Sequence, residues 1–266
     1  MLLDFFAYFF VFIFGLCIGS FLNVIIYRLE EEKKVFGRSF CPQCKKQIKW
    51  YDLIPIFSFL FLKGECRFCH KKISVQYPLI ELVTGILFTI IFCFFGFNWL
   101  VGFNIFALIK ILFLFYIFSS LIIIFVFDLK HYLIPEAVLF PAIGITFIYQ
   151  LTNNFSFAFF DYLLAGALAS LFFGLIFFIS KGKWMGFGDV ELAFLMGLLL
   201  GSLNVVVALF LAFIFGAIIG IILMILQQKN IKSEIPFGPF LILGTFVSIL
   251  LGGQLILMYL NLFALK

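Results

Sequence analysis

The chain has 266 residues, of which 65% are hydrophobic and only 12% are charged. A soluble domain is nearer half apolar and one quarter charged, so this composition excludes a soluble protein and predicts an integral membrane protein. The charge is also unevenly distributed. Eleven of the 18 Lys and Arg residues lie between Arg28 and Lys72, against five acids, so this segment alone carries a net charge of +6.

Long apolar stretches alternate with short polar ones along the chain. A helix that crosses a bilayer needs about 20 apolar residues. The first stretch lacks the basic start of a cleavable signal, so we interpret it as a retained transmembrane helix. In chain order, the expected spans are residues 3–27, 78–95, 99–127, 133–151, 158–179, 190–200, 203–226 and 240–260. The sequence therefore predicts an all-α polytopic membrane protein with about eight transmembrane helices.

Three parts follow from this pattern: a first transmembrane helix (1–27), a polar segment (28–77) and a seven-helix membrane domain (78–266). Basic loops mark the cytoplasmic side of a membrane. Eight spans with both chain ends outside place 16 of the 18 basic residues in the cytoplasm, together with the polar segment. Topology alone explains that charge, although attraction to anionic lipid or to an acidic partner stays open. We expect no nucleic-acid partner.

The polar segment contains two Cys-x-x-Cys pairs, Cys41 with Cys44 and Cys66 with Cys69. Four thiolates at this spacing suit a tetrahedral structural zinc site, and a reducing cytoplasm disfavours disulfides. About 50 residues build little hydrophobic core, so zinc would supply missing folding free energy. His70 adjoins Cys69, but beside four thiolates we interpret it as a bystander.

Two acids lie at the edges of apolar runs. Asp128 ends the span before it, and Asp189 closes the sequence Gly186-Phe187-Gly188-Asp189. An ionisable residue at such a place is expensive and is a candidate functional residue. Two expected spans separate the acids, so both face the cytoplasm. The glycines, Gly186 and Gly188, let the backbone approach a neighbouring chain closely.

Two carboxylates held close together share one proton because both cannot ionise cheaply. The ionised one can then take a proton from water while the protonated one polarises a carbonyl group, which is the chemistry of an aspartyl protease. The alternative is that each acid is a solvated helix-end residue. Asp128 could pair with Lys130 or His131, and Asp189 could favour its own helix N-terminus.

Prolines punctuate the chain near these acids. Pro135 ends any helix continuing from Asp128. Pro236-Phe237-Gly238-Pro239 forms a stiff turn before the last span, on the side that carries both acids. This turn either lines the site or only starts a span.

At this point the motifs resemble a family, the type IV prepilin peptidases, which are leader peptidases and N-methyltransferases of bacterial pilus, type II secretion pseudopilus and competence systems. The resemblance covers nearly the whole chain. The motifs that match the family are Gly19-Ser20-Phe21-Leu22-Asn23-Val24, the two cysteine pairs on either side of residues 48–55, Tyr77-Pro78-Leu79-Ile80-Glu81-Leu82, Asp128 with Leu133-Ile134-Pro135, Gly186-Phe187-Gly188-Asp189, and Ile235-Pro236-Phe237-Gly238-Pro239.

The resemblance implies that Asp128 and Asp189 are catalytic, with Gly186, Gly188 and Pro135 supporting the site. It implies prepilin or pseudopilin substrates, cleavage at the cytoplasmic face of the bacterial inner membrane, and S-adenosylmethionine as methyl donor. No glycine-rich nucleotide loop identifies residues that bind this donor. Glu191 departs from the family, which usually has Lys there, and so reverses a charge beside Asp189.

Two other classes of function explain parts of the pattern. A proton or ion conductor would use the acids as a relay, but it predicts acids distributed through the membrane depth. A non-catalytic membrane scaffold would use the cysteine segment to dock partners, and it would tolerate Asn at both acid positions. The peptidase hypothesis accounts for the paired acids, the topology and the cysteines together.

Overall fold

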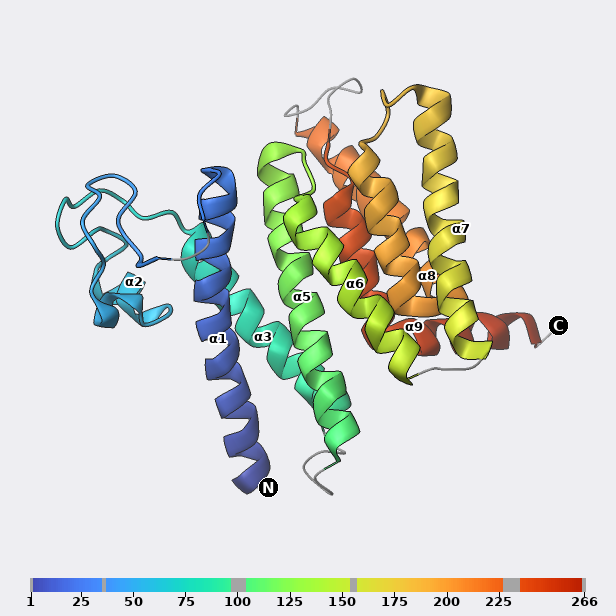
Figure 1. Ribbon diagram of the computed structural model, residues 1–266, viewed down its shortest axis with the longest axis horizontal. Coiled ribbons are helices and arrows are strands. Elements are labelled where there is room, and N and C mark those ends of the chain that lie inside the picture. The colour runs from blue at the N-terminus through green and yellow to red at the C-terminus, as the bar shows by residue number, and fades with distance from the viewer. Residues whose placement is uncertain (1, 35–36, 97–103, 154–156, 227–234, 265–266) are drawn as a thin grey trace. The chain divides into compact units, whose positions relative to one another are not determined.

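The computed structural model describes residues 2–34, 37–96, 104–153, 157–226 and 235–264. In these residues the regular structure is helical, with two isolated β-bridges. The helices are α1 (Leu2–Glu30), the short 3-10 helix η1 (Trp50–Leu53), α2 (Phe57–Phe61), α3 (Gln76–Phe95), α5 (Ile105–His131), α6 (Glu136–Asn153), α7 (Phe157–Ser180), α8 (Phe187–Ile225) and α9 (Gly238–Ala264), as Figure 1 shows. The chain divides into two compact units, residues 1–123 and 124–266.

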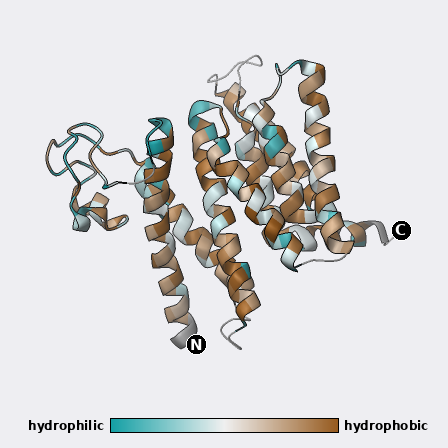
Figure 2. Ribbon diagram, in the orientation of Figure 1, coloured by the Kyte–Doolittle hydropathy of each residue, from teal (hydrophilic) through white to brown (hydrophobic). Residues whose placement is uncertain are grey.

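Six of the described helices, α1, α3, α5, α7, α8 and α9, are long and apolar enough to cross a membrane. Hydrophobic residues cover most of their length, while hydrophilic ones collect toward helix ends and in the cysteine segment (Figure 2). This confirms an all-α polytopic membrane protein. The count is six rather than eight because α6, with 18 residues, is less apolar than the other long helices, and because two expected spans form the single 39-residue α8.

In the first unit, α1 and α3 meet along a seam of small residues. A Cβ added at Gly15 would lie 2.7 Å from the Cα of Gly85, and one added at Gly19 would lie 2.7 Å from the Cα of Glu81. One helical turn further, Asn23 Nδ2 donates to the carbonyl of Tyr77 at 3.0 Å. Residues four apart share one helix face, so this seam lets two backbones approach closely, as small residues do in membrane helix pairs.

In the second unit, α8 lies at the centre and packs against α6, α7 and α9. Small residues again determine how closely these helices approach one another. A Cβ at Gly197 would meet the backbone of Ala165 at 2.5 Å, which brings α7 onto α8. On the other side, a Cβ at Gly244 would contact the carbonyl of Ala208, which brings α9 onto the second half of α8.

The centre of α8 is broken at Gly201, whose φ of 75° and ψ of 174° are not helical. A continuous helix would bond the N–H of Ser202 to the carbonyl of Leu198. Both groups find partners on neighbouring helices: Ser202 N–H donates to Asp161 of α7 at 3.2 Å, and the carbonyl of Leu198 accepts from Gln150 of α6 at 3.1 Å. The donor and the acceptor of the lost bond thus both have new partners, so neighbouring helices stabilise the break.

Candidate functional site

Asp128 lies in the last turn of α5, in the second unit, and is only 5% exposed. The helix ends just beyond it because Tyr132 adopts a left-handed conformation, with φ of 57°, and its N–H bonds the carbonyl of Asp128 at 2.9 Å. Pro135 then caps the next helix, since its carbonyl accepts from Val138 and Leu139. The sequence between α5 and α6 is thereby a tight turn directly after the acid.

Asp189 is the third residue of α8 and is 8% exposed. Gly186 is the N-cap, with extended φ and ψ of −75° and 157°, and its N–H faces the Asp189 carboxyl. An acid that reaches back to the N-cap amide is one half of a capping box. The helix begins at Phe187 and continues through the break at Gly201, which explains how the predicted span 190–200 could be so short.

Ile134 brings the segments around the two acids together. A Cβ added at Gly188 would lie 2.9 Å from the Cβ of Ile134, so the first turn of α8 packs directly on the turn that follows Asp128. A Cβ added at Gly238, the first residue of α9, would lie 3.6 Å from Cδ1 of the same side chain. Three segments that are distant in sequence therefore meet at one isoleucine.

Gly238 also lies directly against Asp128. A Cβ at this position would collide with Oδ2 of the carboxyl group, and the backbone N–H of Gly238 interacts with that carboxyl. The residue before it, Phe237, packs against Phe213 and Phe173 with ring centroids 5.3 and 5.9 Å away. The aromatic contacts fix the start of α9, so the turn at 236–239 lines the site as well as starting a helix.

The two carboxyl groups influence each other electrostatically, and the interaction is that of like charges. Oδ2 of Asp128 is buried and has no hydrogen-bond partner among the described residues. A buried polar atom without a partner is rare in folded proteins and often marks a functional group. The ring of His131 packs on Phe127, with centroids 4.6 Å apart. The catalytic role of the two aspartates stays a prediction.

Two further acids lie near Asp189. Glu191 is partly buried in the first turns of α8 and repels Glu136 at the start of α6. The remaining buried acid, Glu81, belongs to the first unit, where it accepts the N–H of Ile56 at 2.7 Å. Sequence reasoning missed the contact of Gly238 with Asp128 and the central place of Ile134. Its only signal was the proline-rich turn on the side of the acids.

The four cysteines of the polar segment come together in the first unit. The sulfur atoms of Cys41, Cys44, Cys66 and Cys69 all lie within 4.8 Å of one another, and those of Cys41 and Cys69 are 3.9 Å apart. A tetrahedron with zinc–sulfur bonds of about 2.3 Å has edges of about 3.8 Å. The cluster is therefore compatible with one tetrahedral metal ion.

The two cysteine pairs have the same local geometry. In each, the first cysteine accepts a backbone bond from the residue four places on, Lys45 or His70, which has a positive φ of 58° or 55°. Each turn is closed by an isolated bridge, Phe40 with Gln47 and Glu65 with Lys72. His70 thus occupies the turn position of Lys45 and lies outside the sulfur cluster, as expected of a bystander.

The thiols of the cluster differ in acidity. The backbone N–H of Phe68, helped by that of Cys69, lowers the pKa of the Cys66 thiol to about 7. Cys69 accepts from Lys71, yet desolvation and hydrogen bonds with the neighbouring thiols outweigh this and raise its pKa to about 11. Near neutral pH, Cys66 is therefore partly ionised and can bind a cation directly. A cation that binds Cys69 would have to displace its proton.

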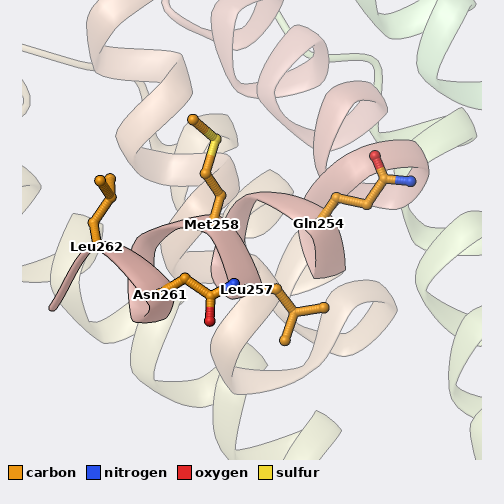
Figure 3. A pocket seen from close by; sticks show the side chains of 5 residues that line it. All are labelled: Gln254, Leu257, Met258, Asn261 and Leu262. Carbon is orange, nitrogen blue, oxygen red and sulfur yellow. The ribbon is translucent and has the colours of Figure 1, made fainter. Parts of the chain in front are cut away.

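A hollow near the end of α9 does not belong to either site. Gln254, Leu257, Met258, Asn261 and Leu262 line it. These side chains all project from one helix and diverge, so no polar groups converge there (Figure 3). Its first residue is about 24 Å along the helix from Gly238, at 1.5 Å per residue.

Comparisons with known proteins agree with this architecture. The model of the bacterial peptidase A24 N-terminal domain matches residues 13–95, and that of the type IV leader peptidase family matches residues 115–221. The chain is 33% identical over 286 residues to the prepilin leader peptidase/N-methyltransferase of Legionella pneumophila, covering 96% of this chain and 95% of the relative. No solved structure matches at a significant level.

Two other relatives carry the same name. The protein of Pseudomonas aeruginosa strain PAO1 is 31% identical over 277 residues, covering 93% of this chain and 91% of the relative. That of Bacillus subtilis strain 168 is 31% identical over 252 residues, covering 94% and 97%. A multi-pass helical membrane protein that matches both of these family models is a membrane protein of the A24 peptidase class. The chain belongs to the type IV leader peptidase family, so the family resemblance seen in its motifs is confirmed.

Proposed function

We propose that this protein is the leader peptidase and N-methyltransferase of a type IV prepilin or pseudopilin system, with Asp128 and Asp189 as its hydrolytic pair. The curated relatives bear this double name over nearly their full length. The observation that carries the site is the meeting of three segments at Ile134, with both acids buried beside it.

The chemistry follows from the burial and the mutual repulsion of the acids. In a poorly solvated site, two carboxylates that repel each other hold one proton between them. The ionised member takes a proton from water, and the protonated member donates to the carbonyl oxygen of the scissile bond. The unpartnered Oδ2 of Asp128 leaves one oxygen available for such a contact.

Substrate geometry suits a site at the membrane surface. A prepilin carries a basic leader in the cytoplasm and an apolar helix in the bilayer, so its cleavage point lies at the cytoplasmic face of the inner membrane. The distribution of Lys and Arg favours the same face for the polar segment and for both acids. The negative charge of Glu191 and Glu136 near Asp189 would attract a basic leader.

The second activity, methylation of the new N-terminus by S-adenosylmethionine, belongs to the same proposal. The segment 28–77 is its proposed location because it is the largest polar part of the chain. A zinc ion held by Cys41, Cys44, Cys66 and Cys69 would stabilise this segment structurally, since four cysteine ligands leave no open position for catalysis.

Replacement of either acid by Asn tests the hydrolytic pair. In protein reconstituted into lipid and given a prepilin, Asp128→Asn and Asp189→Asn should each slow leader removal roughly 100- to 10,000-fold, because each removes an acid–base group. Glu32→Gln is the matched control: it neutralises an exposed acid of the first unit, to which the site assigns no role, and should cleave at nearly the parent rate.

Methyl transfer separates a chemical defect from misfolding. A peptide that begins at the processed N-terminus should be methylated equally by the parent protein and by both Asn variants. Full leader removal by either Asn variant would refute the hydrolytic pair. It would mean that other residues of the protein cleave the leader, whereas no cleavage by the parent protein either would favour a scaffold.

A further inference from the structure

The segment between the two cysteine pairs exposes an unusual amount of apolar surface. We call residues 50–61, which include η1 and α2, the apolar hairpin. Its exposed apolar side chains are Trp50, Leu53, Ile54, Phe57, Leu60 and Phe61. Trp50 is 79% exposed and Phe61 is 83% exposed, so two of its large aromatic side chains are almost uncovered. So many large apolar side chains exposed within twelve consecutive residues indicate an interaction site in a folded protein.

The hairpin is fastened to the membrane helices of its own unit. The N–H of Ile56, at the tip between η1 and α2, donates to Oε2 of Glu81 at 2.7 Å. Ile56 has a φ of 61°, a conformation that β-branched residues rarely adopt, so the chain accepts backbone strain to make this contact. Glu81 is itself buried against Gly19 in the α1–α3 seam.

This attachment sets the depth of the hairpin. Glu81 follows Gln76, the first residue of α3, by five positions, which places it about 7.5 Å along a helix that is apolar enough to cross a membrane. The hairpin therefore lies beside the membrane helices and not beyond their ends. In the view of Figure 1, α2 lies to the left of α1 and below the level of that helix's C-terminal end.

The charges around the hairpin suit a lipid surface. Lys49 precedes it and Lys63 follows it in the chain, and both residues are exposed. Its one acid, Asp52, is neutralised by Arg67, with Nη2 and Oδ1 2.6 Å apart. Apolar and aromatic side chains bordered by cations are typical of segments that lie in the membrane interface, where the cations meet anionic headgroups.

We propose that the apolar hairpin is an interfacial anchor, which inserts its apolar side chains between the lipid headgroups of the leaflet that faces the polar segment. Lys49 and Lys63 would then contact lipid phosphates. The anchor would hold the four-cysteine segment flat on the membrane at a fixed height. The occupant of the apolar surface is thus the bilayer that the protein's own helices cross. This inference does not depend on the peptidase activity.

Tryptophan fluorescence tests this placement in the full-length protein. The chain has three tryptophans, so Trp99→Phe with Trp184→Phe leaves Trp50 as the only one. In vesicles of phosphatidylcholine and phosphatidylglycerol, lipids brominated near the headgroup should quench Trp50 at least about twofold more strongly than lipids brominated near the chain end, as an interfacial position requires. Aqueous iodide should quench it weakly.

A second variant calibrates the depth. Ile86 lies on the exposed surface of α3, further along the same span. Ile86→Trp, in a chain whose own three tryptophans are Phe, should respond most to lipids brominated near the chain end. Leu60→Ser with Phe61→Ser should about halve the quenching of Trp50 by lipid, since it removes apolar surface from the anchor. Val75→Ser, an exposed apolar residue outside the hairpin, should leave it unchanged.

The proposal is overturned if iodide quenches Trp50 strongly and brominated lipid does not, while Ile86→Trp responds to lipid as described. Protection of Trp50 from iodide that arises only when a prepilin is added would also overturn it, and would assign the hairpin to a protein partner. Leader removal by the same preparations is measured separately, so failure of the anchor leaves the peptidase proposal unaffected.

Discussion

At the scale of single residues, the two glycines of Gly186-Phe187-Gly188-Asp189 have different tasks. A Cβ at Gly188 would press against Ile134, whereas one at Gly186 would meet nothing closer than the N of Gly188, 4.0 Å away. The sequence predicts that both glycines permit a close backbone approach. The structure provides a steric reason for Gly188 alone, because only Gly188 faces another segment, at Ile134. That contact arises from the tertiary fold and cannot be seen in the local sequence.

Alanine substitutions should therefore separate the two glycines. Gly188→Ala should lower the free energy of unfolding by about 1–3 kcal/mol, since overpacking displaces Ile134 or the first turn of α8. It should also slow leader removal, because that turn carries Asp189. Gly186→Ala is the matched control and should cost less, at most about 1 kcal/mol, since it replaces a favourable N-cap residue without displacing Ile134. Chemical unfolding in detergent micelles measures the difference, and equal losses for both variants would contradict the packing argument.

At the scale of elements, the break in α8 explains why its first part looked too short to cross a membrane. Residues 187–200 span about 21 Å as a helix, and the chain continues into a second arm after Gly201. Composition and periodicity could predict an apolar run interrupted by Gly201 and Ser202. They could not predict that Gln150 and Asp161, from two other helices, replace the interrupted hydrogen bond.

The bonds at this break can be tested one at a time. Asp161→Ala should destabilise the protein by about 1 kcal/mol, as loss of an N-cap acceptor does, because Ser202 loses its partner for both N–H and hydroxyl. Asp161→Asn keeps an acceptor oxygen and should retain most of the stability. Unfolding free energies of the two variants provide the measurement. Equal values for Ala and Asn would show that Asp161 does not cap the second arm.

At the scale of the whole molecule, the sequence was sufficient for the class of protein and for the order of its apolar segments along the chain. The apolar runs form helices, and the four cysteines form a cluster of sulfur atoms. The two acids are buried side chains. What the sequence could not supply are contacts between distant segments, such as Gly238 on Asp128 and Ile56 on Glu81. These depend on packing, which no single segment encodes.

Metal retention should depend on pH in one direction. Zinc binding requires thiolates, so protons compete as the pH falls. Because the lowered pKa of Cys66 is about 7, its thiolate is available above this value and is lost below it. Challenged with a colorimetric chelator, the purified protein should hold about one zinc ion per chain above about pH 7 and release it progressively toward pH 5.

Cysteine variants provide the control for this measurement. Cys41→Ser should lose the metal at neutral pH, whereas Cys93→Ser, which lies outside the cluster in α3, should retain it. Zinc content that is independent of pH, or equal loss in both variants, would contradict assignment of the metal to the four-cysteine cluster.

The α1–α3 seam has a consequence for the biogenesis of the protein. Asn23 and Glu81 face each other's helices, and an ionisable residue in a lone helix would cost about 2.5–3.5 kcal/mol at the bilayer centre, less toward the surface. In the pair, Asn23 donates to Tyr77, and Glu81 accepts from Ser20 and Ile56. The free energy of inserting α1 and α3 into the bilayer is thus most favourable when the two helices enter as a pair.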